Sequence, residues 1–309
     1  MNGKMKKIKF LSIGLALLMG ASVLAGCNAD PSSSQGGSAA SGTESAGAGT
    51  STVTKADDLF GKRVGVQGGT TGDTYVYEHY TLQGMKELQA KMEEEGETMS
   101  LPSESFDDAE LSRFNKITDA ALDLKNGKLD AVVVDEMPAK KIVEANPDLK
   151  ILDENLTEEE YSIAIQKGNT ELTEKINAAL AKLKENGTFD LLVAKWIDKD
   201  ETAQLPEIPE YTPTGTIVMG TNAEFDPFEF HEDDGTIAGF DVDLSKYIAA
   251  ELGMELKIED MAFDSLISAL QGGKVDFVAA GMTADPERSK NVDFSDSYYS
   301  ASQVIIVKK

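Results

Sequence analysis

The segments LKNGKLDAV at residues 124–132 and LQGGKVDFV at residues 270–278 follow one pattern. Each reads as the end of an amphipathic helix, a glycine that stops the helix, a Lys-apolar-Asp turn and the start of a buried strand. Two such copies, far apart in a chain of 309 residues, predict two related α/β lobes rather than a solenoid, which stacks many short repeats.

The residues before the first copy extend this lobe toward the N-terminus. Residues 63–67 have the pattern of a short strand, residues 68–73 (GGTTGD) form a tight polar loop, and a helix is expected from Thr74 onward. Such a loop presents backbone N–H groups at a helix N-terminus, where an anion can bind. The loop lacks the Gly-Lys-Ser/Thr ending of a nucleotide-binding P-loop, and a glycine-rich turn between a strand and a helix is more often plain topology than a binding site.

The rest of the chain alternates helices and strands. A strand at 129–134 ends at Asp135, and residues 198–214 contain three prolines among charged residues, which indicates an extended linker. Further strands are predicted at 161–166, 216–220, 255–260, 275–280 and 303–307, and helices at 117–126, 169–186, 189–197, 240–252 and 263–271. This alternation predicts an α/β fold with mostly parallel sheets.

The N-terminus has the composition of an export signal. Four lysines precede an apolar run from Phe10 to Leu24, which is too short for a stable membrane span. Residues 1–26 are therefore predicted to be a signal peptide. The sequence LAGC at residues 24–27 resembles the bacterial lipoprotein cleavage box, which implies lipid attachment at Cys27; the alternative is a spare thiol at an ordinary cleavage site. Residues 27–54 are rich in Gly, Ser, Ala and Thr and predict a flexible tether.

Charge limits the classes of partner. Without residues 1–26 the chain has 25 basic and 54 acidic residues, a net charge of −29. Such a polyanion gains nothing from contacts with nucleic-acid phosphates or an anionic leaflet, so a polar small molecule or a cationic partner is expected. His79 and His231 are isolated in the sequence, and neither a metal site nor a cofactor is expected.

Four motifs in the C-terminal part resemble a known family. They are GTNAEFDPFEF at 220–230, GFDVDL at 239–244, AGMTxxPER at 280–288 and VDFSxxYY at 292–299. Together they look like the family-3 extracellular solute-binding proteins of polar amino-acid ABC transporters. The earlier segments GKRVGV (61–66), GTTG (69–72), DAVVVD (130–135) and ENGT (185–188, ahead of Trp196) resemble the second lobe and C-terminal helices of the same family. The resemblance implies a type II, two-lobed periplasmic-binding-protein-like fold.

The order of these segments differs from the family order, because the second lobe precedes the first. We therefore expect a circularly permuted chain, with residues 55–160 as the second lobe, 161–197 as the return crossover and C-terminal helices, 198–214 as the permutation linker and 215–309 as the first lobe. In this arrangement the segment 155–162 alone links the lobes. Two alternatives remain, namely a fragment of a tandem binding protein and lobes swapped between two chains.

The motifs also imply ligand contacts. Arg288 follows the helix-capping pair Asp285-Pro286, and its guanidinium is expected to bind the ligand carboxylate, with donors around Thr283 and, from the other lobe, Thr70 and Thr71. Asp135 and the carbonyl of Gly281 would receive the ammonium group. Phe225 and Phe263 would enclose the ligand side chain, and Asn222 and Gln67 would recognise it. Helix capping and core packing are the competing explanations of these residues.

The resemblance implies that the lobes close on a polar amino acid, which an ABC permease then receives at the outer face of the cytoplasmic membrane. The neutral amide of Asn222 favours an uncharged ligand such as glutamine or cystine, although Glu224 lies nearby. A monomer without catalytic residues is expected. The alternative is an exported dehydratase of the prephenate or arogenate type, which would use Glu224 or Glu136 as the acid.

Overall fold

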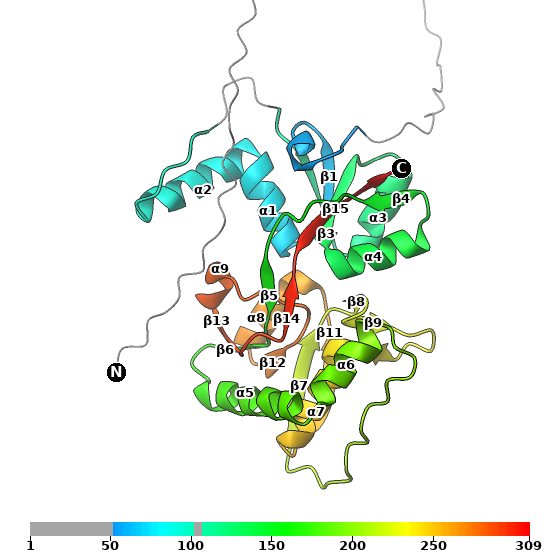
Figure 1. Cartoon of the computed structure of the whole chain (residues 1–309). Helices are drawn as coiled ribbons and strands as arrows, with labels where there is room; N and C mark the ends of the chain where they lie inside the picture. Colours follow the sequence, from blue (N-terminus) through cyan, green and yellow to red (C-terminus); the bar gives the residue numbers. More distant parts are fainter. Residues whose placement is uncertain (1–51, 102–106) are drawn as a thin grey trace, which may run out of the picture. The chain divides into compact units, whose positions relative to one another are not determined.

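Two five-stranded sheets, each covered by helices, organise the chain in this computed structural model (Figure 1), which describes residues 52–101 and 107–309. All the described residues belong to one compact unit. The predicted signal peptide, Cys27 and nearly all of the predicted tether lie outside the described residues.

The second-lobe sheet has the strand order β2-β1-β3-β15-β4. Its strands are β1 (Arg63–Gln67), β2 (Glu110–Phe114), β3 (Ala131–Asp135), β4 (Leu149–Ile151) and β15 (Gln303–Lys308). The helices of this lobe are α1 (Thr71–Tyr80), α2 (Leu82–Glu94), α3 (Ile117–Lys125) and α4 (Glu136–Ala145). Strand β1 is parallel to β2 and β3, whereas β15 is antiparallel to β3 and β4. All five residues of β3 are buried, as its apolar run predicts.

The first-lobe sheet has the strand order β11-β7-β12-β6-β13. Its strands are β6 (Ala164–Gln166), β7 (Thr216–Thr221), β11 (Glu255–Asp260), β12 (Phe277–Val278) and β13 (Val292–Phe294). The helices are α5 (Thr170–Glu185), α6 (Thr188–Trp196), α7 (Phe240–Glu251), α8 (Leu266–Gln271), α9 (Pro286–Ser289) and the 3-10 helix η2 (Phe263–Ser265). A small antiparallel sheet of β8 (Glu224–Phe225), β9 (Glu229–His231) and β10 (Ile237–Ala238) adjoins them.

The aspartate of the repeated sequence pattern has the same role in both lobes. Asp130 accepts a hydrogen bond from the backbone N–H of Arg63 at 2.9 Å, and Asp276 accepts one from Val218 at 2.7 Å. In each case the aspartate joins its own strand to the neighbouring parallel strand, β3 to β1 and β12 to β7. The repeated sequence pattern therefore has the same structural role in both lobes, because in each lobe one carboxylate links the start of a strand to the backbone of the neighbouring parallel strand.

Two short strands carry the chain between the sheets. Strands β5 (Glu159–Tyr161) and β14 (Tyr299–Ala301) pair antiparallel (Figure 1). Through β5 the chain passes from β4 in the second-lobe sheet to β6 in the first-lobe sheet, and through β14 it returns from β13 to β15. The expectation of a single link between the lobes at 155–162 is therefore wrong, because the chain crosses twice.

The last strand explains that error. The sequence placed residues 303–307 in the first lobe, but β15 pairs with β3 and β4 in the second-lobe sheet (Figure 1). Five of its six residues are buried, so it needs a site inside a sheet with both faces covered. Sequence periodicity identifies such a strand but does not select the sheet that it joins.

Three smaller differences concern boundaries. The predicted long helix after Thr74 is two helices, α1 and α2, because the backbone of Thr81 is extended and its side chain caps α2 by accepting from Gly84 at 3.1 Å. Val53, assigned to the flexible tether, is buried in the second-lobe core. The predicted strand 161–166 is divided between β5 and β6. Among the described helices, none combines the length and apolarity that a membrane span requires.

Candidate functional site

A pocket lies where the carboxyl ends of the parallel strands of both lobes meet. Gln67 ends β1, Asp135 ends β3 and Asn222 follows β7. In open α/β sheets this edge is where ligands bind. The residues that line the pocket are Gln67, Thr70, Thr71, Asp135, Asn222, Phe225, Glu229, Phe263, Gly281, Thr283 and Arg288. They include all ten residues that the sequence singled out as ligand contacts, and Glu229 is the addition.

Arg288 forms the cationic end of the pocket. Its Nη1 donates to the carbonyl oxygen of Thr283 at 2.9 Å, its Nη2 donates to that of Gly69 at 3.0 Å, and its Nε lies 3.2 Å from a carboxylate oxygen of Asp285. The contact with Gly69 spans the two lobes. Because Asp285 and one carbonyl hold the guanidinium on the first lobe, its fork has a fixed direction, which suits bidentate binding of a carboxylate.

The loop after β1 brings the second lobe to this guanidinium. Gly69 has φ +76, and a Cβ built on it would lie 3.1 Å from the side chain of Asp264 in the first lobe. Thr70 is the N-cap of α1, with its hydroxyl donating to the carbonyl of Gln67 at 2.8 Å and accepting from Asp73 at 3.3 Å. The N-terminus of α1, including Thr71, therefore borders the pocket beside Arg288, where backbone N–H groups favour an anion.

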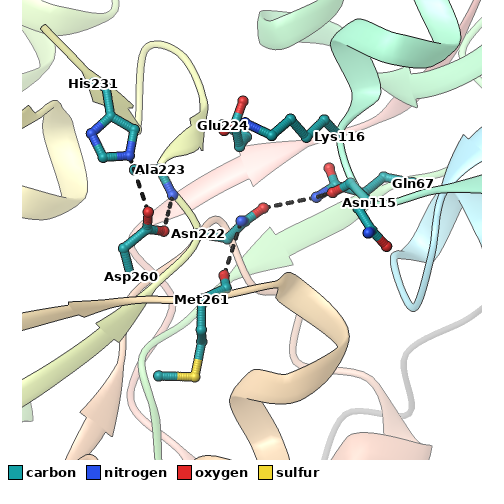
Figure 2. A network of polar contacts seen from close by, with 9 residues as sticks. All are labelled: Gln67, Asn115, Lys116, Asn222, Ala223, Glu224, His231, Asp260 and Met261. Atoms are coloured by element: carbon teal, nitrogen blue, oxygen red, sulfur yellow. Dashed lines mark hydrogen bonds and ion pairs between the residues drawn. The ribbon is translucent and has the colours of Figure 1, made fainter. Parts of the chain in front are cut away.

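Two amide side chains meet at another part of the pocket. Gln67 Nε2 donates to Asn222 Oδ1 at 2.7 Å, across the lobes, and Asn222 Nδ2 donates to the carbonyl of Met261 at 2.9 Å (Figure 2). Gln67 also donates to the carbonyl of Asn115 at 3.1 Å. These hydrogen bonds orient both amides, so that a polar ligand side chain meets groups of fixed direction.

Asp135 is the buried acid of the second lobe. Its carboxylate accepts from the hydroxyl of Tyr161 at 2.5 Å, and burial together with the nearby Glu159 raises the pKa of Asp135 to about 7. Glu159 in turn accepts from Thr283 at 2.6 Å and from Gln303 at 3.0 Å. A cation placed beside Asp135 would offset the repulsion between the two acids, which fits the predicted contact with an ammonium group.

A second acid pair supports Gly281. Asp241 Oδ2 accepts from the backbone N–H of Gly281 at 2.8 Å and from the hydroxyl of Tyr298 at 2.8 Å. Burial and the neighbouring Asp241 raise the pKa of Glu229 well above its usual range, which favours its protonated form. Gly281 has φ +52, and an added Cβ would lie 2.5 Å from the ring of Phe225. The backbone thus approaches the pocket where a side chain does not fit.

The two predicted aromatic residues have different surroundings. The ring of Phe225 packs against those of Tyr161 and Phe228 at centroid distances of 6.3 and 5.7 Å. The guanidinium carbon of Arg288 lies 5.5 Å from the ring centroid of Phe263, within the range of a cation–π contact. Phe263 therefore contributes to the position of Arg288 as well as to the lining of the pocket.

Sequence reasoning missed Glu229, Asp241 and Glu159. Glu159 stands among three consecutive glutamates, which look like a solvated surface run, and Glu229 lies between two phenylalanines in an alternating strand pattern. The burial of these acids depends on tertiary packing. Glu136 and Glu224, the two acids that the dehydratase alternative would use, do not line the pocket. Glu136 pairs with Lys140 at 2.6 Å.

Neither histidine belongs to a metal-binding cluster. His231 Nε2 lies 3.0 Å from Asp260, which also accepts from the N–H of Ala223 (Figure 2), and His79 stacks on Tyr75 at a ring distance of 4.4 Å. Within residues 52–101 and 107–309, no group of three or more His, Cys, Asp or Glu side chains is placed to hold a metal ion.

Comparison with known proteins relates the chain to one family. The sequence profile of the bacterial extracellular solute-binding proteins, family 3, matches residues 46–199 and 217–309. The arginine-binding extracellular protein ArtP of Bacillus subtilis (strain 168) is 52% identical over 93 residues, 30% of this chain and 36% of ArtP. The L-cystine-binding protein TcyJ of Escherichia coli (strain K12) is 33% identical over 95 residues, 31% of this chain and 36% of TcyJ.

Among solved structures, an ancestral arginine-binding protein bound to arginine is 52% identical, with a TM-score of 0.27 and coverage of 28% of this chain and 38% of that chain. The chain thus spans about a third of the length of the two curated relatives in each match.

Proposed function

The chain belongs to the bacterial extracellular solute-binding proteins of family 3, and we propose that it captures a polar amino acid between its lobes and delivers it to an ABC permease. The observation that carries this proposal is the composition of the pocket. It combines a fixed guanidinium, a buried carboxylate and two oriented amides, contributed by both lobes. The guanidinium suits the carboxylate of an amino acid, the buried carboxylate suits its ammonium group, and the two amides suit a polar side chain.

The roles of the individual residues follow from this arrangement. Arg288 would bind the ligand carboxylate, assisted by N–H groups of Thr70, Thr71 and Thr283. Asp135 and the carbonyl of Gly281 would hold the ammonium group. Phe225 and Phe263 would cover the ligand side chain, and Asn222 with Gln67 would bind its polar end. The same two amides already join the lobes at 2.7 Å, so a ligand that reaches them from the pocket contacts both lobes, and this favours the closed state.

For the ligand itself we propose an uncharged polar amino acid, such as glutamine or cystine. Neither acid of the pocket is assigned to a cationic side chain: Asp135 is assigned to the ammonium group, and burial raises the pKa of Glu229 and disfavours its charged form. The name of TcyJ agrees with this proposal, whereas the name of ArtP favours a cationic ligand.

We propose a lipid anchor at Cys27 that holds the protein at the outer face of the membrane, and a circularly permuted order of the lobes. The permuted order is supported by packing at β4. Ala56, near the start of the described chain, donates to Glu154 at 2.7 Å, and Lys309 donates to the carbonyl of Asp148 at 2.9 Å. Residues 56 and 309, far apart in sequence, thus both contact the segment 148–154, as a permuted order requires.

A thermal-shift screen of the purified chain against all amino acids and cystine tests the proposed function. We expect glutamine or cystine to raise the melting temperature, and calorimetry to give one site per chain. An R288Q variant should show no shift with the same ligand. Failure of every amino acid to stabilise the wild-type protein would contradict the proposal.

The dehydratase of the prephenate or arogenate type remains the second candidate. One observation favours it: Glu229 lines the pocket and its pKa is raised by burial, and an acid that keeps its proton can protonate a leaving hydroxyl group. Its carboxyl group, however, faces Asp241, which has a structural role in holding Gly281. Incubation of the protein with arogenate, followed by chromatography for phenylalanine, distinguishes the two, and we expect no product.

A further inference from the structure

A second contact between the lobes lies beside the two pocket amides. Lys116 of the second lobe forms an ion pair with Glu224 of the first lobe (Figure 2). The Glu224 side chain is only 20% exposed, whereas that of Lys116 is 52% exposed. Glu224 is therefore an acid largely removed from water, and the ammonium group that offsets its charge comes from the opposite lobe.

The chain neighbours of this pair are the residues that line the amide part of the pocket. Glu224 stands between Asn222 and Phe225, both of which border the pocket. Lys116 follows Asn115, whose carbonyl accepts from Gln67. The ion pair and the Gln67–Asn222 hydrogen bond thus belong to the same two backbone segments, and Figure 2 shows them next to each other.

A second acid, Asp260, lies near the ion pair. Its carboxylate accepts a hydrogen bond from the N–H of Ala223 and contacts His231, and because it is negatively charged it cannot offset the charge of Glu224 as Lys116 does. The Glu224 and Asp260 carboxylates both raise the pKa of Lys116, with the hydrogen bond to Glu224 as the main cause. Lys116 is therefore held in its charged form by an acidic environment, and its removal would leave a net negative charge beside the amides.

We propose that Lys116 is a specificity-determining residue: by pairing with Glu224 across the lobes, it cancels the negative charge beside the pocket amides and favours an uncharged ligand side chain over a cationic one. This inference rests on the proposed function. A cationic side chain that reaches the amides meets the ammonium group of Lys116, and it can use Glu224 only by displacing that group. Without Lys116, the free carboxylate would attract the same side chain.

A purely structural role for Lys116 gives a different result. If the ion pair only holds the lobes together, its loss weakens every ligand by the same factor, because closure is common to all of them. The ratio of two affinities therefore separates the two roles. A matched control exists in Lys141 of α4, which pairs with Asp226 of the first lobe at 2.8 Å, and neither residue lines the pocket.

The test is calorimetric titration of the full chain, as wild type, K116Q, E224Q, K116Q/E224Q and K141Q, with glutamine and arginine. We expect K116Q to shift the affinity ratio toward arginine by about tenfold, the effect of one partly buried charge. E224Q should not gain arginine affinity, the double variant should return to the wild-type ratio within about twofold, and K141Q should leave the ratio unchanged.

Two results would overturn the inference while leaving the proposed function intact: an equal change of both affinities in K116Q, or a shift toward arginine that persists in the double variant. A wild-type protein that already prefers arginine to glutamine would overturn the inference together with the proposed ligand class, but not the capture of an amino acid. Circular dichroism melts of each variant confirm that it is folded. If the wild-type protein binds neither these two ligands nor any other amino acid, it is the proposed function that fails.

Discussion

The protonation of Asp135 provides the sharpest test of how the proposed site works. Its pKa of about 7 results from burial and from Glu159, and only the ionised carboxylate attracts an ammonium group. We therefore predict that amino-acid affinity depends on pH between 6 and 8. With a pKa of about 7, the ionised fraction is about 90% at pH 8, about 50% at pH 7 and about 10% at pH 6.

The ionised fraction of Asp135 sets the size of the expected change in affinity. Lowering the pH from 8 to 6 should raise the dissociation constant about tenfold, and binding at pH 7 should release about half a proton per ligand. Calorimetry at several pH values, in buffers with different ionisation enthalpies, measures both quantities. The control is E159Q, which removes the neighbouring charge that raises the pKa of Asp135, so that the midpoint of the pH dependence should move below 7.

A dissociation constant that stays the same from pH 6 to 8, or proton uptake on binding, would refute this reasoning. A pH dependence with the same midpoint in the E159Q variant would show that another group titrates. In either case Asp135 would not be the group whose titration controls binding between pH 6 and 8.

Three further predictions concern Arg288, Gly281 and the buried acids. R288Q should weaken amino-acid binding at least about a hundredfold in calorimetry, because it removes two charge-assisted hydrogen bonds, and R288K should recover only part of the loss. G281A should lower the free energy of unfolding by about 1–3 kcal/mol and weaken binding, because its Cβ meets Phe225 at 2.5 Å; G273A, with a similar φ of +69 but no atom within 4 Å, should cost less in the same denaturant titrations. Stability without ligand should fall as the pH rises from about 4.5 to 7, because Asp135, Asp241 and Glu229 hold protons longer when folded than when unfolded; stability that rises over this range in urea titrations would contradict the assignment.

The local structure of this chain follows closely from its sequence. Strand β11 has the predicted bounds of 255–260, and the repeated Lys-apolar-Asp turn marks the entry to the central strand of each lobe. These features depend on residues that are near in sequence, such as the glycine that ends a helix and the apolar run that follows it. Local propensity and periodicity are sufficient to find them.

The features that sequence could not predict depend on contacts between distant residues. Strand β15 has the apolar pattern of a buried strand, but only the pairing with β3 shows which sheet it completes. Glu229 and Glu159 resemble surface acids until the fold buries them, and the pairing of Lys116 with Glu224 joins residues more than a hundred positions apart. The ten expected ligand contacts do converge on one pocket, because most of them stand at strand ends, at helix starts or in the loops that connect them, which the α/β pattern places at the same edge.

Native mass spectrometry after incubation with an equimolar mixture of all amino acids and cystine measures directly whether one chain binds one amino acid. We expect a monomeric protein that retains one ligand per chain, and the released ligand should be an uncharged polar amino acid such as glutamine or cystine. Retention of arginine or lysine alone would contradict the assigned specificity. A protein that retains no amino acid, or that does so only as a dimer, would contradict the claim that one chain forms a complete amino-acid site.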